Sequence, residues 1–267
     1  MDRSKIRTLP RRVLEKLPEA WRSDLAAVAA RRITRGMSGA SVFRLATEPE
    51  NILKVATGKY AASMRDEITR TRWLAAQGIA VPKILRAHAD DEIGIMQMHR
   101  VPGVPADHCR WAADRLLPAL GHAFARLHAL PLTACPFDES AAVRLAVAAQ
   151  AVERDEVNVE DFDEKNLGVA PEILLASLTR NAPPEDLVVA HGDADFSNMI
   201  VAADGGVAFI DCGHAGKSDR YLDLAIVGAE IVERFKRQGL AIFMEAYGQS
   251  HWDDSKAAYY RDLYEFF

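Results

Sequence analysis

Polar and apolar residues alternate along residues 31–57, and this pattern predicts three short β-strands. The alternation is clearest in Ser41–Leu45. Residues 60–78 instead repeat apolar side chains at helical spacing, and Gly78 ends that helix. Two further strands are predicted at residues 84–88 and 93–98. The N-terminal part of the chain is therefore expected to be a small β-rich lobe with one helix.

Helical periodicity dominates the chain after residue 110. Residues 111–130 have one amphipathic pattern, with Leu116, Leu120 and Phe124 on the same side. The exception is the segment 187–211, where apolar runs separated by turn residues predict strands and one hairpin. The remaining helices are predicted at residues 140–156, 171–180, 220–237, 238–248 and 254–266.

The segment 100–108 separates these two patterns. It contains two prolines and one glycine within a few residues, which is the composition of a linker. We therefore expect an α+β, bilobal fold, with an N-terminal lobe at residues 1–99 and a larger, mostly helical lobe at residues 109–267.

Composition narrows the class of protein. The formal net charge is -5 and the pI is about 5.9, whereas a nucleic-acid-binding protein usually has a basic excess. No apolar run approaches the roughly 20 residues of a membrane helix, and no signal-peptide core is visible. Three cysteines without metal-ligand spacing are expected to be reduced. We expect a cytoplasmic monomer that binds neither nucleic acid nor membranes. One basic cluster is expected to be a solvated terminal segment: Arg3, Lys5, Arg7, Arg11 and Arg12.

Three carboxylates and one amide stand out in "VVAHGDADFSNMIVAADGGVAFIDCG", residues 188–213, namely Asp193, Asp195, Asp211 and Asn198. Turn formation is one explanation, because Asp and Asn are common turn residues. The spacing favours another, since protein kinases place a catalytic base and Mg²⁺ ligands in an H-R-D-x-x-x-x-N loop and on a later Asp. Here His191 is expected to orient the loop, Asp193 to accept the proton of an attacking hydroxyl, and Asn198 and Asp211 to bind Mg²⁺.

The N-terminal lobe supports this interpretation independently. A kinase needs a Gly-rich loop over the phosphates, a strand lysine and a helix glutamate. Gly36, Ser38 and Gly39 occupy the first position, Lys54 lies on an apolar strand, and Glu67 lies on the following helix. Taken alone, the glycines could form a hairpin turn, Lys54 could be a charge on an edge strand, and Glu67 could be a solvated acid on a helix. Their order along the chain predicts a nucleotide-binding lobe in which Lys54 and Glu67 form an ion pair.

With these motifs the chain resembles the aminoglycoside phosphotransferases, above all those that modify the 3'-hydroxyl. The resemblance implies a protein-kinase-like fold, ATP or GTP as the phosphate donor, and Mg²⁺ as the cofactor. It also implies that the backbone near Met98, His99 and Val101 contacts the nucleobase, and that Asp223 holds the catalytic loop. The matching segments are "AHGDADFSN" (190–198), "AFIDCG" (208–213), "DRYLDLA" (219–225), "HALPLTACPFD" (128–138) and "LYEFF" (263–267).

The acceptor side has a physical argument of its own. Residues 153–164 contain seven acids and one arginine, which is usually a solvated charge run. A cationic aminosugar would favour such a surface, because aminoglycosides carry several ammonium groups. The chain departs from the family pattern at three positions near the acceptor. His214 and Ala229 stand where the family usually has arginines, and Tyr264 stands where it has an acid. The family resemblance implies that the acceptor-binding residues are Asp161, Asp163, Glu164, Asp193, Glu233, Glu265 and Phe267, the last through its terminal carboxylate.

Three functions remain open at this point. The first is phosphate transfer to the 3'-hydroxyl of kanamycin- or neomycin-type antibiotics, which would confer resistance. The second is the same chemistry on the streptomycin 3''-hydroxyl, choline or another small metabolite. The third is a non-catalytic nucleotide-binding module, which the presence of Lys54, Asp193, Asn198 and Asp211 disfavours. The three departures favour the second function, and the "LYEFF" terminus favours the first.

Overall fold

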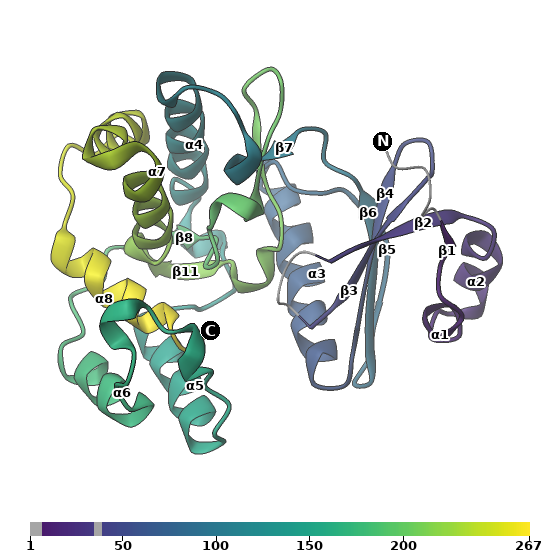
Figure 1. The fold of residues 1–267 in the computed structure, drawn as a ribbon, viewed down its shortest axis with the longest axis horizontal. Coiled ribbons are helices and arrows are strands. Elements are labelled where there is room, and N and C mark those ends of the chain that lie inside the picture. The colour runs from purple at the N-terminus through teal and green to yellow at the C-terminus, as the bar shows by residue number, and fades with distance from the viewer. Residues whose placement is uncertain (1–6, 35–38) are drawn as a thin grey trace. The chain divides into compact units, whose positions relative to one another are not determined.

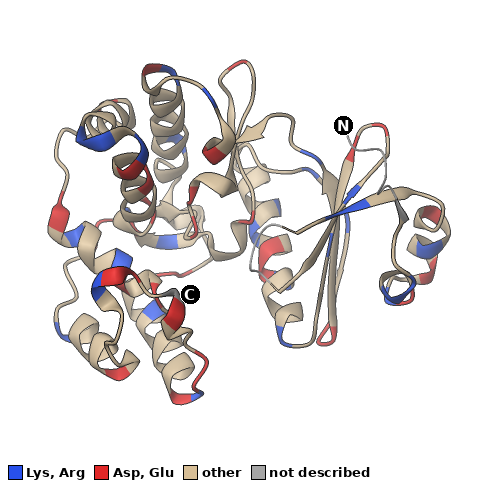
Figure 2. Ribbon diagram, viewed as in Figure 1, with Lys and Arg blue, Asp and Glu red and all other residues tan. Residues whose placement is uncertain are grey.

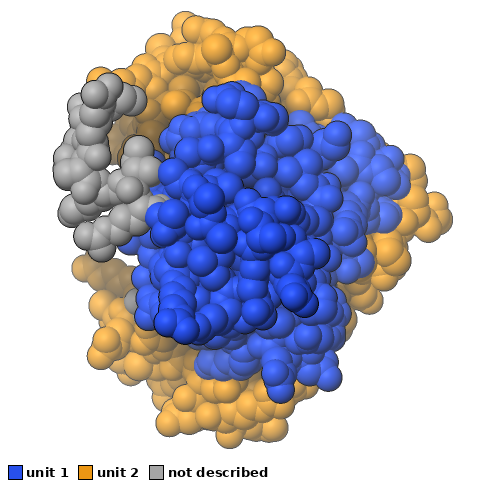
Figure 3. Space-filling view, turned by 90° about the vertical axis from the view of Figure 1, so that its right-hand side faces the viewer, with its two compact units in different colours: residues 1–102 blue, residues 103–267 orange. Residues whose placement is uncertain are grey.

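The computed structural model describes residues 7–34 and 39–267. The chain divides into two compact units, unit 1 (residues 1–102) and unit 2 (residues 103–267), which Figure 3 colours separately. Each unit has buried apolar residues of its own, so each is described by itself.

Unit 1 is built on a six-stranded antiparallel sheet (Figure 1). Helix α3 (Ala61–Ala76) follows a 3₁₀ turn, η1 (Gly58–Tyr60), and packs mainly against the last two strands of the sheet, β6 and β5. The predicted strands and helix of the N-terminal lobe are therefore confirmed to within a few residues. In sheet order the strands are β1 (Arg7–Thr8), β2 (Ala29–Ile33), β3 (Ser41–Leu45), β4 (Asn51–Thr57), β6 (Ile93–His99) and β5 (Ile84–Ala89).

Side chains of β4 alternate between the two faces of this sheet, as they must in an extended strand. Leu53 and Val55 belong to a core cluster with the N-terminal segment. Ala56 belongs to a second cluster, formed with Met64 and other residues of α3. Lys54 lies between Leu53 and Val55 in the sequence, so its side chain is on the α3 face.

The N-terminal segment covers the other face of the sheet. Residues 9–25, which include helices α1 (Arg11–Leu14) and α2 (Glu19–Leu25), bury five apolar side chains there. The prediction of a solvated basic cluster holds for the side chains of Arg11 and Arg12, but it missed that the segment carrying them packs on the sheet. Each helix has only one or two turns, too few for periodicity to reveal. The Arg11 side chain does face solvent, whereas Arg3 and Lys5 lie outside the described residues. The buried side chains are Leu9, Val13, Leu17, Trp21 and Leu25.

Unit 2 is mostly helical, as predicted. Helices α4 and α7 pack side by side, and the Phe124 ring meets Phe209 and Phe243 edge-on, with centroids 5.3 and 5.9 Å apart. Two helices were expected where α7 lies, and α7 is interrupted at Lys236, whose backbone is not helical. The helices are α4 (Ala113–His128), α5 (Ala141–Glu153), α6 (Pro171–Arg180), α7 (Tyr221–Tyr247) and α8 (Asp254–Tyr264). The 3₁₀ turns are η2 (Ala106–His108), η3 (Leu132–Ala134), η4 (Val159–Asp161), η5 (Glu164–Asn166), η6 (Phe196–Asn198) and η7 (Cys212–His214).

Two small sheets carry the motif-bearing segment. The order of the first is β10-β9-β7, and the second pairs β8 with β11. The predicted hairpin is therefore β9 and β10 alone, because β8 pairs with a strand that follows them. Strand β7 comes from the segment expected to be a linker, which thus joins a sheet of unit 2. Residues of these strands are β7 (Val104–Pro105), β8 (Leu187–Ala190), β9 (Met199–Val201), β10 (Val207–Phe209) and β11 (Gly216–Asp219).

Candidate active site

The loop predicted to be catalytic, residues 191–198 and called the catalytic loop below, connects β8 to β9 and is fixed by hydrogen bonds to its backbone. Asp223, in the first turn of α7, accepts the amide N–H of His191 at 2.7 Å and that of Gly192 at 2.8 Å. Gly192 has a φ of 84°, and a Cβ there would lie 2.4 Å from the carbonyl oxygen of His214. Only glycine fits without a shift. The prediction that Asp223 holds this loop is confirmed.

The His191 ring anchors the loop from inside the protein. Its Nε2 lies 2.9 Å from the carbonyl oxygen of Ile210, at the end of β10, and the ring is buried. Because a carbonyl oxygen can only accept, Nε2 donates this hydrogen bond. His191 therefore orients the loop, as expected from the sequence.

The residues predicted for catalysis and metal binding lie together in unit 2. Asn198 donates through Nδ2 to the Asp193 carboxylate oxygen Oδ2 at 3.0 Å and to the Asp193 carbonyl oxygen at 2.9 Å. Ile210 donates its backbone N–H to the carbonyl oxygen of Asn198 at 2.9 Å, and Asp211 is the next residue. The hairpin thus brings Asp211 beside Asn198, which in turn holds the carboxylate of Asp193.

The donor set of Asn198 and Asp211 fits Mg²⁺. With Nδ2 directed at Asp193, the amide oxygen of Asn198 points away from the base. One amide oxygen and one carboxylate are hard oxygen ligands, and Mg²⁺ usually takes only one or two carboxylates plus phosphate oxygens and water. Asp211 also has a φ of 58°, a conformation that is uncommon for a non-glycine residue and concentrates at functional sites.

Unit 1 holds the predicted ion pair. The Nζ of Lys54 on β4 lies 2.7 Å from both carboxylate oxygens of Glu67 on α3, and both residues are buried. An isolated buried charge would be costly, so each charge stabilises the other. The lysine is therefore held in one orientation on the α3 face of the sheet, as a phosphate-binding lysine needs to be.

The other residues predicted to bind the nucleotide occupy two parts of unit 1. Gly39 precedes β3 and has a φ of 64°, while Gly36 and Ser38 lie outside the described residues. Met98 is buried in β6, and the ring of His99 lies 3.0 Å from the side-chain amide of Asn51. Val101 follows β6 and is half-buried. Their contact with a nucleotide stays a prediction.

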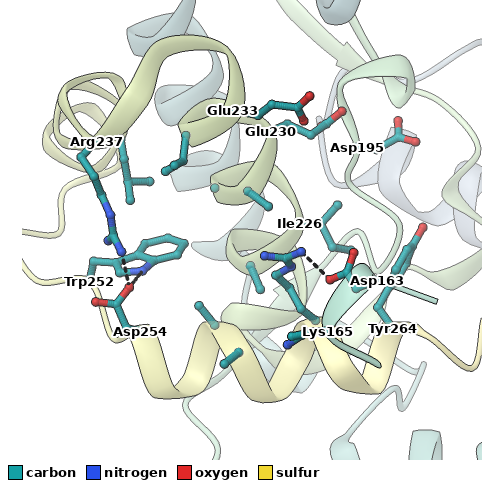
Figure 4. Close-up of a pocket in the computed structure, with 18 of the residues that line it drawn as sticks. Asp163, Lys165, Asp195, Ile226, Glu230, Glu233, Arg237, Trp252, Asp254 and Tyr264 are labelled. Atoms are coloured by element: carbon teal, nitrogen blue, oxygen red, sulfur yellow. Dashed lines mark hydrogen bonds and ion pairs between the residues drawn. The ribbon is translucent and has the colours of Figure 1, made fainter. Parts of the chain in front are cut away.

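A pocket of about 730 Å³ opens in unit 2 among α7, α8 and the loops beside them (Figure 4). Three of the predicted acceptor-binding residues line it, namely Asp163, Glu233 and Glu265. Asp193, Glu164 and Phe267 do not line it, and the side chain of Asp161 lies outside the described part of the structure. The pocket therefore gathers only part of the predicted set.

Two of these acids are already engaged within the protein. Asp163 forms an ion pair with Arg261 of α8. Glu265 accepts hydrogen bonds from the Asn166 side chain at 2.8 Å and from the backbone N–H of Asp163 at 2.9 Å. Burial raises the pKa of Glu265 despite these bonds. Asp163 and Glu265 therefore contribute to the structure of the pocket wall as well as to its negative charge.

Three carboxylates outside the predicted acceptor-binding set also line the pocket, namely Asp195, Glu230 and Asp254. Asp195 and Glu230 line the pocket and lie near Glu233 at one end of it (Figure 4). Burial, followed by the negative charges of Asp195, Asp107 and Glu233, raises the pKa of Glu230 to about 7, against the effect of a hydrogen bond from the Phe196 backbone. Glu230 is three residues before Glu233 on one helix, so helical spacing could have revealed it.

The three positions that depart from the family pattern all lie in unit 2. The hydroxyl of Tyr264 donates a hydrogen bond to Oδ1 of Asp193. Ala229 lines the pocket without any charge. The His214 ring meets the Phe267 ring edge-on, with centroids 6.4 Å apart. The departures therefore reach Asp193, the predicted base, as well as the pocket.

Comparison with known proteins agrees with this site. Residues 29–260 match the phosphotransferase enzyme family. An aminoglycoside 3'-phosphotransferase from Streptomyces fradiae is 34% identical over 256 residues, which are 88% of this chain and 94% of that protein. A streptomycin 3''-kinase from Streptomyces griseus is 35% identical over 225 residues, 80% of this chain and 82% of that protein.

Solved structures give the same result. The crystal structure of aminoglycoside-3'-phosphotransferase of type VIII has a TM-score of 0.84 and 35% identity, covering 93% of this chain and 97% of that one. The aminoglycoside phosphotransferase APH(3'')-Id from Streptomyces rimosus, solved with ADP and streptomycin, has a TM-score of 0.77 and 27% identity, covering 89% and 92%.

The chain therefore belongs to the phosphotransferase enzyme family, and within it to the aminoglycoside phosphotransferases. It is an enzyme of the kinase type with the bilobal, kinase-like fold that its sequence predicts. No helix in the described part of the chain is long and apolar enough to cross a membrane.

Proposed function

We propose that this enzyme transfers the γ-phosphate of ATP or GTP to the 3'-hydroxyl of kanamycin- and neomycin-type aminoglycosides. One observation carries the proposal, namely that the loop holding Asp193 also supplies Asp195 to a carboxylate-rich pocket. A polycationic sugar would be held there by Asp195, Glu230 and Glu233, since each ammonium group reduces repulsion among these neighbouring acids.

Asp193 acts as the base in the proposed reaction. The acceptor hydroxyl oxygen forms a bond to the γ-phosphorus while the bond from that phosphorus to the nucleoside diphosphate breaks, and the hydroxyl proton passes to Asp193. Asn198 holds the base through Oδ2, so its carboxylate is oriented before the acceptor arrives. Positioning of this kind supplies much of the acceleration in phosphoryl transfer.

Two sets of residues are proposed for the donor nucleotide and its metal ion. Lys54, fixed by Glu67, would neutralise phosphate oxygens of the nucleotide in unit 1. Asn198 and Asp211 would hold Mg²⁺, which neutralises the charge that develops on the phosphates. Phosphorylation of an antibiotic at this hydroxyl would make the enzyme a resistance factor, which growth of an expressing host on kanamycin would test.

The streptomycin 3''-hydroxyl is the second candidate acceptor. It is favoured by His214, Ala229 and Tyr264, which replace charged residues expected near the acceptor of a 3'-enzyme. The 3'-enzyme and the streptomycin 3''-kinase reported above are also similar to this chain to nearly the same degree. The terminal segment "LYEFF" keeps the 3'-hydroxyl as the first proposal.

A coupled nucleotide-turnover assay would distinguish the acceptors. The panel is kanamycin, neomycin, streptomycin, choline and tobramycin, an aminoglycoside without a 3'-hydroxyl. We expect turnover with kanamycin and neomycin and none with tobramycin. Turnover with streptomycin alone would move the acceptor to the 3''-hydroxyl, and turnover with choline alone would remove aminoglycosides from the proposal.

Replacing the base tests the mechanism. In Asp193→Ala we expect kcat to fall by about 100-fold or more, the usual contribution of a general base, while nucleotide affinity is kept. Asp204→Ala, an exposed acid in the turn between β9 and β10, is the control and should keep full activity. Near-normal kcat in Asp193→Ala would refute the assignment of the base.

A further inference from the structure

Helix α8 ends at the catalytic base. Tyr264 is its last residue, and the Tyr264 hydroxyl donates a hydrogen bond to Oδ1 of Asp193. The other carboxylate oxygen, Oδ2, accepts from Asn198 Nδ2 at 3.0 Å. Each oxygen of the base therefore has one donor, and the two donors come from segments far apart in the sequence. A carboxylate held at both oxygens cannot turn about its own axis without breaking one of these bonds.

The Tyr264 hydroxyl acts as a donor in this contact. Burial and the neighbouring charge of Asp193 raise the pKa of Tyr264 above its usual value, so the phenol keeps its proton at neutral pH. A hydrogen bond from a neutral donor to a carboxylate is stronger than one between neutral groups. It therefore holds the carboxylate of Asp193 more firmly than a hydrogen bond between two neutral groups would.

The contact is specific to Tyr264 and not a general property of α8. Tyr259 and Tyr260 lie on the same helix, and neither hydroxyl has a hydrogen-bond partner in the described part of the protein. Helical position alone therefore does not give a tyrosine of α8 a partner. Tyr264 obtains one because it reaches the catalytic loop.

The surroundings of Tyr264 hold it firmly. Leu263 is fully buried, and Phe266 packs against the Phe162 ring with centroids 6.2 Å apart. Glu265, the next residue, accepts two hydrogen bonds from the segment before α6. Tyr264 also lines the acceptor pocket, so one side chain borders the acceptor and contacts the base.

We propose that Tyr264 is a positioning residue for Asp193, which fixes the carboxylate so that the second lone pair of Oδ1 faces the acceptor hydroxyl. A carboxylate oxygen can accept two hydrogen bonds, so Tyr264 and the acceptor bind to it together. The inference rests on the proposed role of Asp193 as the base. It gives a function to a residue at which the chain departs from the family pattern.

The kinetic test is the pair Tyr264→Phe and Tyr260→Phe, which remove the same atom from the same helix. In Tyr264→Phe we expect kcat to fall about tenfold, the value of one hydrogen bond to a charged group, with both KM values within about twofold of wild type. Tyr260→Phe should match wild type. Unchanged kcat in Tyr264→Phe, or a rise in acceptor KM alone, would overturn the proposal.

A spectroscopic test needs no turnover and no acceptor. The six tyrosines can be labelled as 3-fluorotyrosine, and the Tyr264 resonance is the one missing from Tyr264→Phe. We expect Asp193→Asn to move the Tyr264 resonance and leave that of Tyr260 in place. A Tyr264 resonance that does not move would overturn the contact while leaving the proposed function intact. Failure of every acceptor in the panel would instead refute the function and leave this result standing.

Discussion

At the scale of single residues, the pKa of each carboxylate removed from solvent depends on the hydrogen-bond donors and the charges around it. Asp223 is fully buried, which alone raises its pKa, but the hydrogen bond and charge of His128 and the bonds from the catalytic loop lower it overall. Glu230 has only one backbone donor and three acidic neighbours, so its pKa is raised to about 7. The surroundings of Asp223 therefore favour its ionised form, whereas those of Glu230 disfavour its ionised form.

The raised pKa of Glu230 predicts a pH-dependent stability. Its folded-state value of about 7 exceeds the ordinary value of 4.5, so its favourable contribution is complete below pH 4.5 and is lost as the pH rises through 7. Glu230→Gln cannot ionise, and it should therefore raise Tm above wild type at about pH 8 but not at about pH 4.5. Calorimetry at both pH values checks this. Glu245→Gln, at an exposed position further along the same helix, is the control. An equal Tm change at both pH values for Glu230→Gln would contradict the prediction.

At the scale of elements, the sequence predicted what local periodicity can encode. The strand at Ser41–Leu45, the amphipathic helix α4 and helix α6 appear close to their expected bounds. The spacing of the catalytic loop also located Asp193 and its partner Asn198, since both lie in one short segment.

Contacts between distant segments could not be read in this way. The pairing of β8 with β11 depends on the whole unit, and the predicted hairpin gave no sign of it. The bond between Tyr264 and Asp193 joins residues 71 positions apart, and the resemblance suggested only that Tyr264 lies near the acceptor. Spacing places Glu230 beside Glu233 on one helix, but the burial that raises the pKa of Glu230 could not be read from spacing.

Helix α7 contains a strained residue that can be tested. Lys236 has a φ of 63° and a ψ of -176°, a region that almost only glycine occupies at low cost. Lys236→Gly should relieve about 1 kcal/mol or more of strain, which corresponds to a rise in Tm of about 2–4 °C. Lys236→Ala keeps the Cβ and should give no such rise in thermal unfolding. Equal Tm values for the two variants would show that the interruption of α7 is not strained.

At the scale of the whole molecule, acidic and basic residues nearly balance in number, but several acidic side chains lie close together at the pocket. Acidic and basic residues are interspersed over the elements of both units (Figure 2), and the formal net charge is only -5. Against this background, Asp195, Glu230 and Glu233 stand close together at one end of the pocket. A polycationic acceptor would therefore be attracted by a local field and hardly at all by the overall charge.

This local attraction predicts a salt dependence of acceptor use. Raising the ionic strength from about 0.05 M to about 0.5 M screens charges beyond a few ångströms, so kcat/KM for the aminoglycoside should fall severalfold, through KM. Steady-state kinetics at saturating nucleotide measures this directly. Glu233→Gln removes the exposed charge of the group, so it should lower kcat/KM at low salt and flatten the dependence. A salt dependence as steep in Glu233→Gln as in wild type would mean that this end of the pocket does not bind the cationic groups of the acceptor.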